Sequence, residues 1–238
     1  MSGKDSVASS AKVLSDGTFN IDGGMLVYGV PSYYGKSFKA RLKPLFVETG
    51  DERILVDTGI GDPPEKLKDI YRIEKEIDLK SSLKGLGLDP EDITMVINTH
   101  LHFDHTGYNQ LFTSARFISQ EDEIRYSENP HRFQKGGYFQ PNIRGLDYKA
   151  VKGEVEVASG VTVIPTPGHT PGHQSVSIEL PDEVIIYTGD VSPLSVNHDK
   201  KYIVGVLFNP VDALRSLELL DEMKGRWSKP VRYIYSHE

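Results

Sequence analysis

Residues 98–109 read Asn-Thr-His-Leu-His-Phe-Asp-His-Thr-Gly-Tyr-Asn, and this stretch carries four metal-binding side chains: His100, His102, Asp104 and His105. The apolar run from Ile93 to Ile97 precedes it and predicts a buried strand. His100 and His102 lie two positions apart, so in an extended segment they point to the same side and can bind one ion together. Asp104 and His105 follow and can turn toward a second ion, with Asp104 capping a short helix.

The composition supports a metal centre built from nitrogen and oxygen ligands. Only 8 histidines occur in 238 residues, so three within six positions are not expected of an ordinary surface loop. Imidazoles and carboxylates are suitable ligands for zinc and similar divalent ions. The chain contains no cysteine, which excludes thiolate ligands and a disulfide framework.

Length and charge narrow the class of protein. A chain of 238 residues suits a single α/β domain that spans 1–238, with a polar segment at 1–12 that we expect to be flexible. The net charge of -7 argues against nucleic acid as a partner. No apolar stretch approaches the ~20 residues that span a bilayer, and no signal peptide is evident. We therefore expect a cytoplasmic protein, monomeric or homodimeric, that acts on a small molecule and binds no membrane.

Apolar patterning predicts alternating strands and helices. The predicted strands are Met25–Val30, Leu45–Glu48, Ile54–Val56, Val161–Ile164, Val176–Leu180, Val184–Tyr187 and Val231–Tyr235. One helix is predicted over Pro63–Leu86. A second begins at Asn209-Pro210, with an apolar stripe of Val211, Leu214, Leu217 and Leu220.

Residues 127–152 form the least regular segment, rich in proline, glycine, aromatic and basic residues. A loop of this length inside a compact domain is commonly functional, which favours a lid over the site. The alternative is a surface excursion that packs on the domain without a chemical role.

Three further metal-binding residues also follow predicted strands: His169, Asp190 and His237. Active sites of open α/β sheets form beyond strand ends, where loops converge. Each of these residues alone is weak evidence, but their joint occurrence is specific. Asp57, in Asp57-Thr58-Gly59, also ends a strand; it either orients the metal loop from behind or caps its own loop.

Five histidines and two aspartates are too many for one tetrahedral ion, but two ions that share a carboxylate would use all seven. Two cations lower the pKa of a water between them toward ~7, which generates a nucleophilic hydroxide. The predicted reaction class is therefore metal-assisted hydrolysis.

The motif His100-x-His102-x-Asp104-His105, followed by His169, Asp190 and His237, resembles the signature of the metallo-β-lactamase superfamily. The amino-acid sequences of residues 99–105 and 166–175 are similar to the corresponding segments of the N-acyl homoserine lactonases. The resemblance implies an αββα sandwich of two mixed sheets flanked by helices. It implies two Zn²⁺ ions, with iron or manganese as alternatives, on His100, His102 and His169 and on Asp104, His105 and His237. Asp190 would bridge the ions, and His173 would support the ligands without binding metal.

One position departs from the lactonase pattern. Those enzymes carry a tyrosine three residues after the bridging aspartate, near the substrate carbonyl, where this chain has Pro193. The tyrosine is then absent or supplied from elsewhere, and Tyr148 and Tyr202 are the candidates for substrate binding.

The function implied by the resemblance is opening of an N-acyl homoserine lactone ring by a metal-bridging hydroxide, which is quorum quenching. Asp104 and Asp190 would be the catalytic carboxylates, with Asp104 passing a proton to the leaving alkoxide. Alternatives within hydrolases are a thioesterase of the hydroxyacylglutathione hydrolase type, another esterase, a β-lactamase or a phosphodiesterase. A di-iron redox protein or a metal-binding scaffold is the alternative outside hydrolases.

Overall fold

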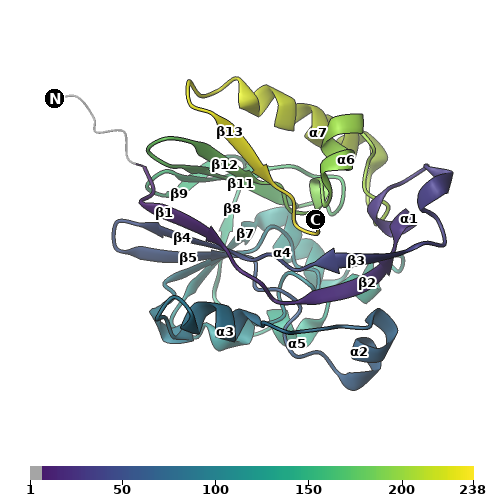
Figure 1. Ribbon diagram of the computed structural model, residues 1–238, viewed down its shortest axis with the longest axis horizontal. Helices are drawn as coiled ribbons and strands as arrows, with labels where there is room; N and C mark the ends of the chain where they lie inside the picture. The colour runs from purple at the N-terminus through teal and green to yellow at the C-terminus, as the bar shows by residue number, and fades with distance from the viewer. Residues whose placement is uncertain (1–6) are drawn as a thin grey trace.

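The computed structural model describes residues 7–238 and consists of two β-sheets packed face to face, with helices on both outer sides (Figure 1). The first sheet contains, in spatial order, β1 (Ser10–Val13), β4 (Leu45–Thr49), β5 (Glu52–Val56), β6 (Met95–Ile97), β7 (Arg116–Gln120) and β8 (Tyr148–Val151). The second contains β13 (Val231–Ile234), β12 (Val184–Tyr187), β11 (Gln174–Glu179), β10 (Val161–Pro165) and β9 (Val155–Ala158). Both sheets mix parallel and antiparallel pairs, so the predicted αββα sandwich is confirmed.

The remaining elements are a hairpin and seven α-helices among the described residues. The hairpin pairs β2 (Thr18–Asp22) with β3 (Ser37–Arg41). The helices are α1 (Gly23–Leu26), α2 (Glu65–Tyr71), α3 (Leu79–Lys84), α4 (Glu121–Glu128), α5 (Gln140–Ile143), α6 (Ser195–Lys200) and α7 (Pro210–Lys224). No helix within residues 7–238 combines the length and apolar character needed to cross a bilayer.

The central core lies between the two sheets. Successive strand residues point to opposite faces, so β5 sends Ile54 and Val56 into this core and Leu55 to the outer side. The second sheet contributes Val176 and Ile178 of β11 to the same core. β5 was recognisable in the sequence by its continuous apolar run, and β11 by the alternation of apolar residues along it.

Each outer face is covered by helices (Figure 1). Leu79 and Leu83 of α3 pack on the first sheet, and Leu217 and Leu220 of α7 pack on the second. Asn209 caps α7 as predicted, because its side chain accepts hydrogen bonds from the backbone N–H groups of Val211 and Asp212. The predicted stripe is partly wrong, since Val211 and Leu214 are exposed while Ala213, Ser216 and Met223 are buried.

Two predicted elements differ in the structure. The helix over 63–86 is two helices, because Arg72 adopts a left-handed conformation that ends α2 and Asp78 caps a new start at α3. Met25–Val30 is not a strand; α1 and a turn occupy it, and the strands are β2 and β3 on either side.

The expectation of flexibility for residues 1–12 is wrong for Ser10–Lys12, which pair with β4. Residues 1–6 lie outside the described part of the chain. Residues 127–152 are not one loop: they include the end of α4, helix α5 and strand β8, which forms the edge of the first sheet.

Candidate metal centre

The direction of the strands brings the predicted metal-binding residues to one edge of the sandwich. β12 is antiparallel to β11 and parallel to β13, and β11 is antiparallel to β10, so β10, β12 and β13 all run the same way. The loops after these strands therefore emerge together and carry His169, Asp190 and His237. Parallel strands β5 and β6 of the first sheet deliver Asp57 and the loop 98–105 to the same place.

The seven side chains form two groups. The first group is His100, His102 and His169, and the second group is Asp104, His105, Asp190 and His237. Within each group, one ligand atom from every residue lies within 4.8 Å of the others. All seven side chains except that of Asp104 are buried.

The first group has the geometry of a cation site. His169 Nδ1 donates to the carbonyl of Val206 at 2.6 Å, so in the neutral ring Nε2 is unprotonated and carries a free lone pair. The Thr99 hydroxyl donates its hydrogen to Asp57, so it accepts a hydrogen bond from His100 Nδ1. His100 Nε2 therefore also carries a free lone pair. These two Nε2 atoms lie 3.1 Å apart, and His102 Nδ1 lies 2.9 Å from that of His169. Two lone pairs cannot hydrogen-bond to each other, so a shared cation fits this arrangement.

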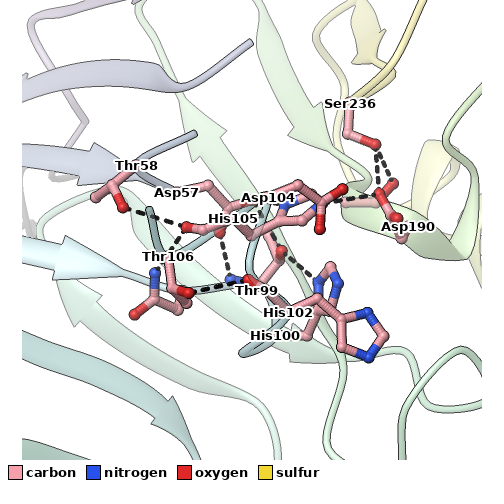
Figure 2. A network of polar contacts seen from close by, with 12 residues as sticks. Asp57, Thr58, Thr99, His100, His102, Asp104, His105, Thr106, Asp190 and Ser236 are labelled. Carbon is pink, nitrogen blue, oxygen red and sulfur yellow. Dashed lines mark hydrogen bonds and ion pairs between the residues drawn. The ribbon is translucent and has the colours of Figure 1, made fainter. Parts of the chain in front are cut away.

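The second group is organised by Asp190 (Figure 2). Asp190 Oδ1 lies 3.3 Å from Nε2 of both His105 and His237, while its Oδ2 lies 3.7 Å from His169 Nε2 in the first group. Ser236 fixes this orientation by donating to Oδ1 at 2.7 Å. Asp190 therefore faces both groups, as a bridging carboxylate does.

Asp104 completes the second group. Its Oδ2 lies 3.6 Å from His237 Nε2 and 3.8 Å from His105 Nε2. Both of these imidazoles donate their Nδ1–H outward, His105 to Asp57 at 2.7 Å and His237 to the carbonyl of Arg41 at 2.8 Å. Within the described residues His105 Nε2 is buried without a hydrogen-bond partner. An orphaned acceptor of this kind fits a metal ligand.

Asp57 supports both groups from behind, as one of the two sequence interpretations held (Figure 2). Its carboxylate accepts from the Thr99 backbone N–H, from the Thr99 hydroxyl and from His105 Nδ1, at 2.7 to 2.8 Å. Its φ of 60° lies in the left-handed region, which is costly for a residue other than glycine. The contacts with the metal loop offset this strain.

His173 lies behind Asp190, in the loop that leads into β11 of the same second sheet. Its Nε2 accepts the backbone N–H of Asp190 at 2.9 Å, and its Nδ1 lies 3.0 Å from the Thr166 carbonyl. Burial, and then the neighbouring His169, lowers the pKa of His173 to about 3, so it is neutral and can accept this bond. His173 orients a predicted ligand and is itself in neither group.

The two groups differ in electrostatics. Burial, followed by the neighbouring imidazoles, holds the pKa of His100 and His102 well below the usual range, so both are neutral as ligands must be. In the second group burial also opposes charge on His105 and His237, but the neighbouring carboxylates, Asp190 foremost, together outweigh burial and raise the pKa of both imidazoles. The second group thus has the more negative surroundings.

A cavity of about 450 Å³ opens onto both groups. Its polar wall includes His102, Asp104, His169, Asp190 and His237. The rest of its wall is largely apolar and includes Phe19, Ile21, Met25, Leu26, Phe103, Phe133, Val204, Val206 and Leu207. An apolar cavity with convergent polar groups at one end is typical of a small-molecule site.

The two tyrosines predicted for substrate binding are not among the cavity residues. The Tyr148 side chain packs against the core of the first sheet, and its hydroxyl accepts from Asn109 at 3.0 Å. Tyr202 is 36 % exposed at the surface. The positions of these two rings therefore do not support either tyrosine as a substrate-binding residue of this cavity.

A different tyrosine, Tyr71, lines the cavity. It is the last residue of α2, and its ring packs on Phe103 with centroids 5.4 Å apart and on Phe19 at 6.1 Å. Burial and the carboxylate of Asp104 raise its pKa, so the phenol keeps its proton. No sequence pattern singled out Tyr71, because it lies inside a predicted helix whose break at Arg72 was not foreseen.

Part of the irregular segment reaches the centre. Gln134 donates from Nε2 to the carbonyl of His169 at 2.6 Å, and the Gly137 carbonyl accepts from the Phe103 backbone N–H at 2.7 Å. A Cβ at Gly137 would lie 2.6 Å from the His102 ring, so only glycine fits. Residues 133–137 are therefore the part of the predicted lid that forms the cavity wall; lid motion stays a prediction.

Comparison with known proteins agrees with this geometry. A family model described as the metallo-beta-lactamase superfamily matches residues 45–230. An N-acyl homoserine lactonase of Bacillus thuringiensis is 31% identical over 205 residues, 81% of this chain and 79% of that protein. A second, from Rhizobium radiobacter, is 34% identical over 157 residues, 62% of this chain and 60% of that protein.

A solved structure of an N-acyl homoserine lactone hydrolase, with the product N-hexanoyl-L-homoserine at its catalytic metal centre, superposes with a TM-score of 0.84. It is 28% identical to this chain, and the match covers 97% of this chain and 94% of the other.

Proposed function

The chain belongs to the metallo-β-lactamase superfamily, and from this premise we propose that it is a dinuclear zinc lactonase that opens the ring of N-acyl homoserine lactones. It is a metal-dependent hydrolase by its family. The observation that carries the proposal is the position of Asp190, whose two carboxylate oxygens face two separate groups of ligand atoms. The lactonase activity of the relatives supplies the substrate class.

In this proposal His100, His102 and His169 hold one ion, Asp104, His105 and His237 hold the other, and Asp190 binds both. When bound, two Zn²⁺ ions polarise the lactone carbonyl and supply a water that is nucleophilic at neutral pH. The residues behind the ligands hold the geometry before substrate arrives, which reduces the reorganisation required during reaction.

Ring opening forms a bond between the water oxygen and the acyl carbon and breaks the bond between that carbon and the ring oxygen. The ring oxygen leaves as an alkoxide and needs a proton. Asp104 lines the cavity and is its least buried acid, at 12% side-chain exposure against 8% for Asp190. We assign it the transfer of the proton from the attacking water to the alkoxide. The apolar wall of the cavity suits an acyl chain.

Tyr71 carries a hydroxyl group on the cavity wall, and we assign it the role of hydrogen-bond donor to the substrate. We expect Tyr71→Phe to lower kcat on the order of tenfold to a hundredfold while KM changes little, since a donor to a developing oxyanion acts in the transition state. Initial rates across a range of lactone concentrations test this. Tyr202→Phe, at the surface, is the matched control and should leave both constants unchanged. A Tyr71→Phe enzyme with wild-type kcat would remove Tyr71 from the mechanism.

A substrate panel tests the proposed function itself. We expect kcat/KM for N-acyl homoserine lactones to exceed that for S-acylglutathione, nitrocefin and bis-p-nitrophenyl phosphate by about a hundredfold or more. Zinc-loaded protein and protein stripped with a chelator should be compared in parallel. Preference for the thioester, or for the phosphodiester, would replace the lactonase proposal by that rival activity on the same centre.

Two other parts of the proposal come from the sequence alone. A cytoplasmic location and a monomeric or homodimeric state stay predictions, to be tested by cell fractionation and by light scattering.

A further inference from the structure

Glu123 is a fully buried carboxylate that lies outside the cavity and outside both ligand groups. It is in the first turn of α4, and 0% of its surface is exposed. Burying a carboxylate costs free energy unless hydrogen bonds replace the lost water. Four donors surround it, all neutral, so a cation partner does not account for its position.

The four donors belong to three segments around the first group. Oε1 accepts from the Leu101 backbone N–H and the Tyr138 hydroxyl, both at 2.9 Å. Oε2 accepts from the Thr170 hydroxyl at 2.5 Å and from the Gly172 backbone N–H at 3.2 Å. A Cβ at Gly172 would lie 2.1 Å from the backbone nitrogen of Glu123, so this close approach requires glycine.

Three of the four contacts reach a direct neighbour of a first-group histidine. Leu101 stands between His100 and His102, and Thr170 follows His169. The Tyr138 ring packs edge-on against the His102 ring, with centroids 4.8 Å apart. One carboxylate thus ties the loop from the first sheet to the loop from the second, at the point where their histidines meet.

The second group has different supports. His105 is held by Asp57, His237 by the carbonyl of Arg41, and Asp190 by Ser236 and His173. None of these bonds involves Glu123. Asp57, by contrast, reaches both groups, since it holds His105 directly and His100 through Thr99.

We propose that Glu123 is a positioning residue that sets the metal affinity of the first group, His100, His102 and His169, without acting on the second. The inference rests on the proposed function only in requiring that the two groups bind metal. It implies that the binding affinity for one ion can be lowered without lowering that for the other, although the two sites share Asp190.

Glu123→Gln changes the chemistry with little change in volume. The two backbone N–H donors, of Leu101 and Gly172, approach different oxygens, so both oxygens must accept. A glutamine has one acceptor oxygen, and its NH₂ would face the other N–H donor. One side of the tie between the loops is therefore lost.

The test is Co²⁺ binding to single-group proteins, followed by visible absorbance against a competing chelator. His237→Ala impairs the second group and keeps the first intact, and His169→Ala does the reverse. In the His237→Ala protein we expect Glu123→Gln to weaken Co²⁺ binding on the order of tenfold to a hundredfold, the range for residues that orient metal ligands. In the His169→Ala protein we expect less than about a threefold change, because none of the bonds that support the second group involves Glu123.

The second background also controls for folding, because unchanged Co²⁺ affinity there requires an intact centre. Asp57→Asn is the contrasting variant and should weaken binding in both backgrounds. Thr170→Val removes one bond to Glu123 and should reproduce part of its effect in the His237→Ala protein alone. Equal losses in both backgrounds, or none in either, would overturn the role of Glu123 while leaving the lactonase proposal intact. Failure of both backgrounds to bind Co²⁺ would refute the metal centre, and with it both proposals.

Discussion

His169→Ala is expected to reduce the bound metal from two ions per chain to about one and to lower lactone hydrolysis on the order of a hundredfold or more. His169 is the single member of the first group contributed by the second sheet. Without it His100 and His102 remain, and two imidazoles are too few for a tight site. Asp190 Oδ2 then also loses its nearest neighbour in the first group, the Nε2 atom of His169.

Elemental analysis of zinc-supplemented protein and initial rates on the same sample measure both effects. His131→Ala is the matched control, since His131 lies outside both groups. It should retain two ions and near-wild-type stability. A His169→Ala protein with full metal content and full activity would show that the first group is not a metal site.

Gly107→Ala is expected to destabilise the fold by about 3 kcal/mol or more, the upper part of the range for overpacking. A Cβ at Gly107 would lie 1.9 Å from the carbonyl carbon of Ile60 and 2.1 Å from the nitrogen of Gly61. Both obstacles are backbone atoms, so no side chain can rotate away. Gly107 also donates its N–H to the Gly59 carbonyl at 2.7 Å, so the loop after β5 and the metal loop are in direct contact.

Urea unfolding measures this loss as a change in midpoint at constant slope. Gly136→Ala is the control, because a Cβ there meets no atom within 4 Å, and its effect should stay within about 0.5 kcal/mol. If Gly107→Ala unfolds at the wild-type midpoint, the two loops are not packed as closely as the structure has them.

The residues of the two groups were predictable as a cluster because each group member follows a predicted strand; β6 and β12 are buried throughout, whereas β10 and β13 are buried only in part. Such strands show as apolar runs, and parallel neighbours bring their following residues to one edge. That is why His169, Asp190 and His237 could be placed near the loop 98–105 without any knowledge of contacts. Asp57 was recognised for the same reason, although its left-handed backbone was not.

Residues that act through tertiary contacts were not predictable. Glu123 lies in a run of acidic residues that reads as an ordinary exposed helix start, yet α4 turns this one side chain inward. Tyr71 enters the cavity because Arg72 reverses the chain with a positive φ of 44°, which is rare for arginine. Tyr148 was assigned to the cavity, but its register in β8 directs it into the core.

The two groups draw on both halves of the sandwich. His100, His102, Asp104 and His105 extend from the first sheet, while His169, Asp190 and His237 extend from the second. An ion bound there would be held by ligands from both sheets. Its binding affinity and the free energy of unfolding of the sandwich are therefore thermodynamically linked. We therefore expect removal of the ions to lower the free energy of unfolding, and separation of the two sheets to release the ions.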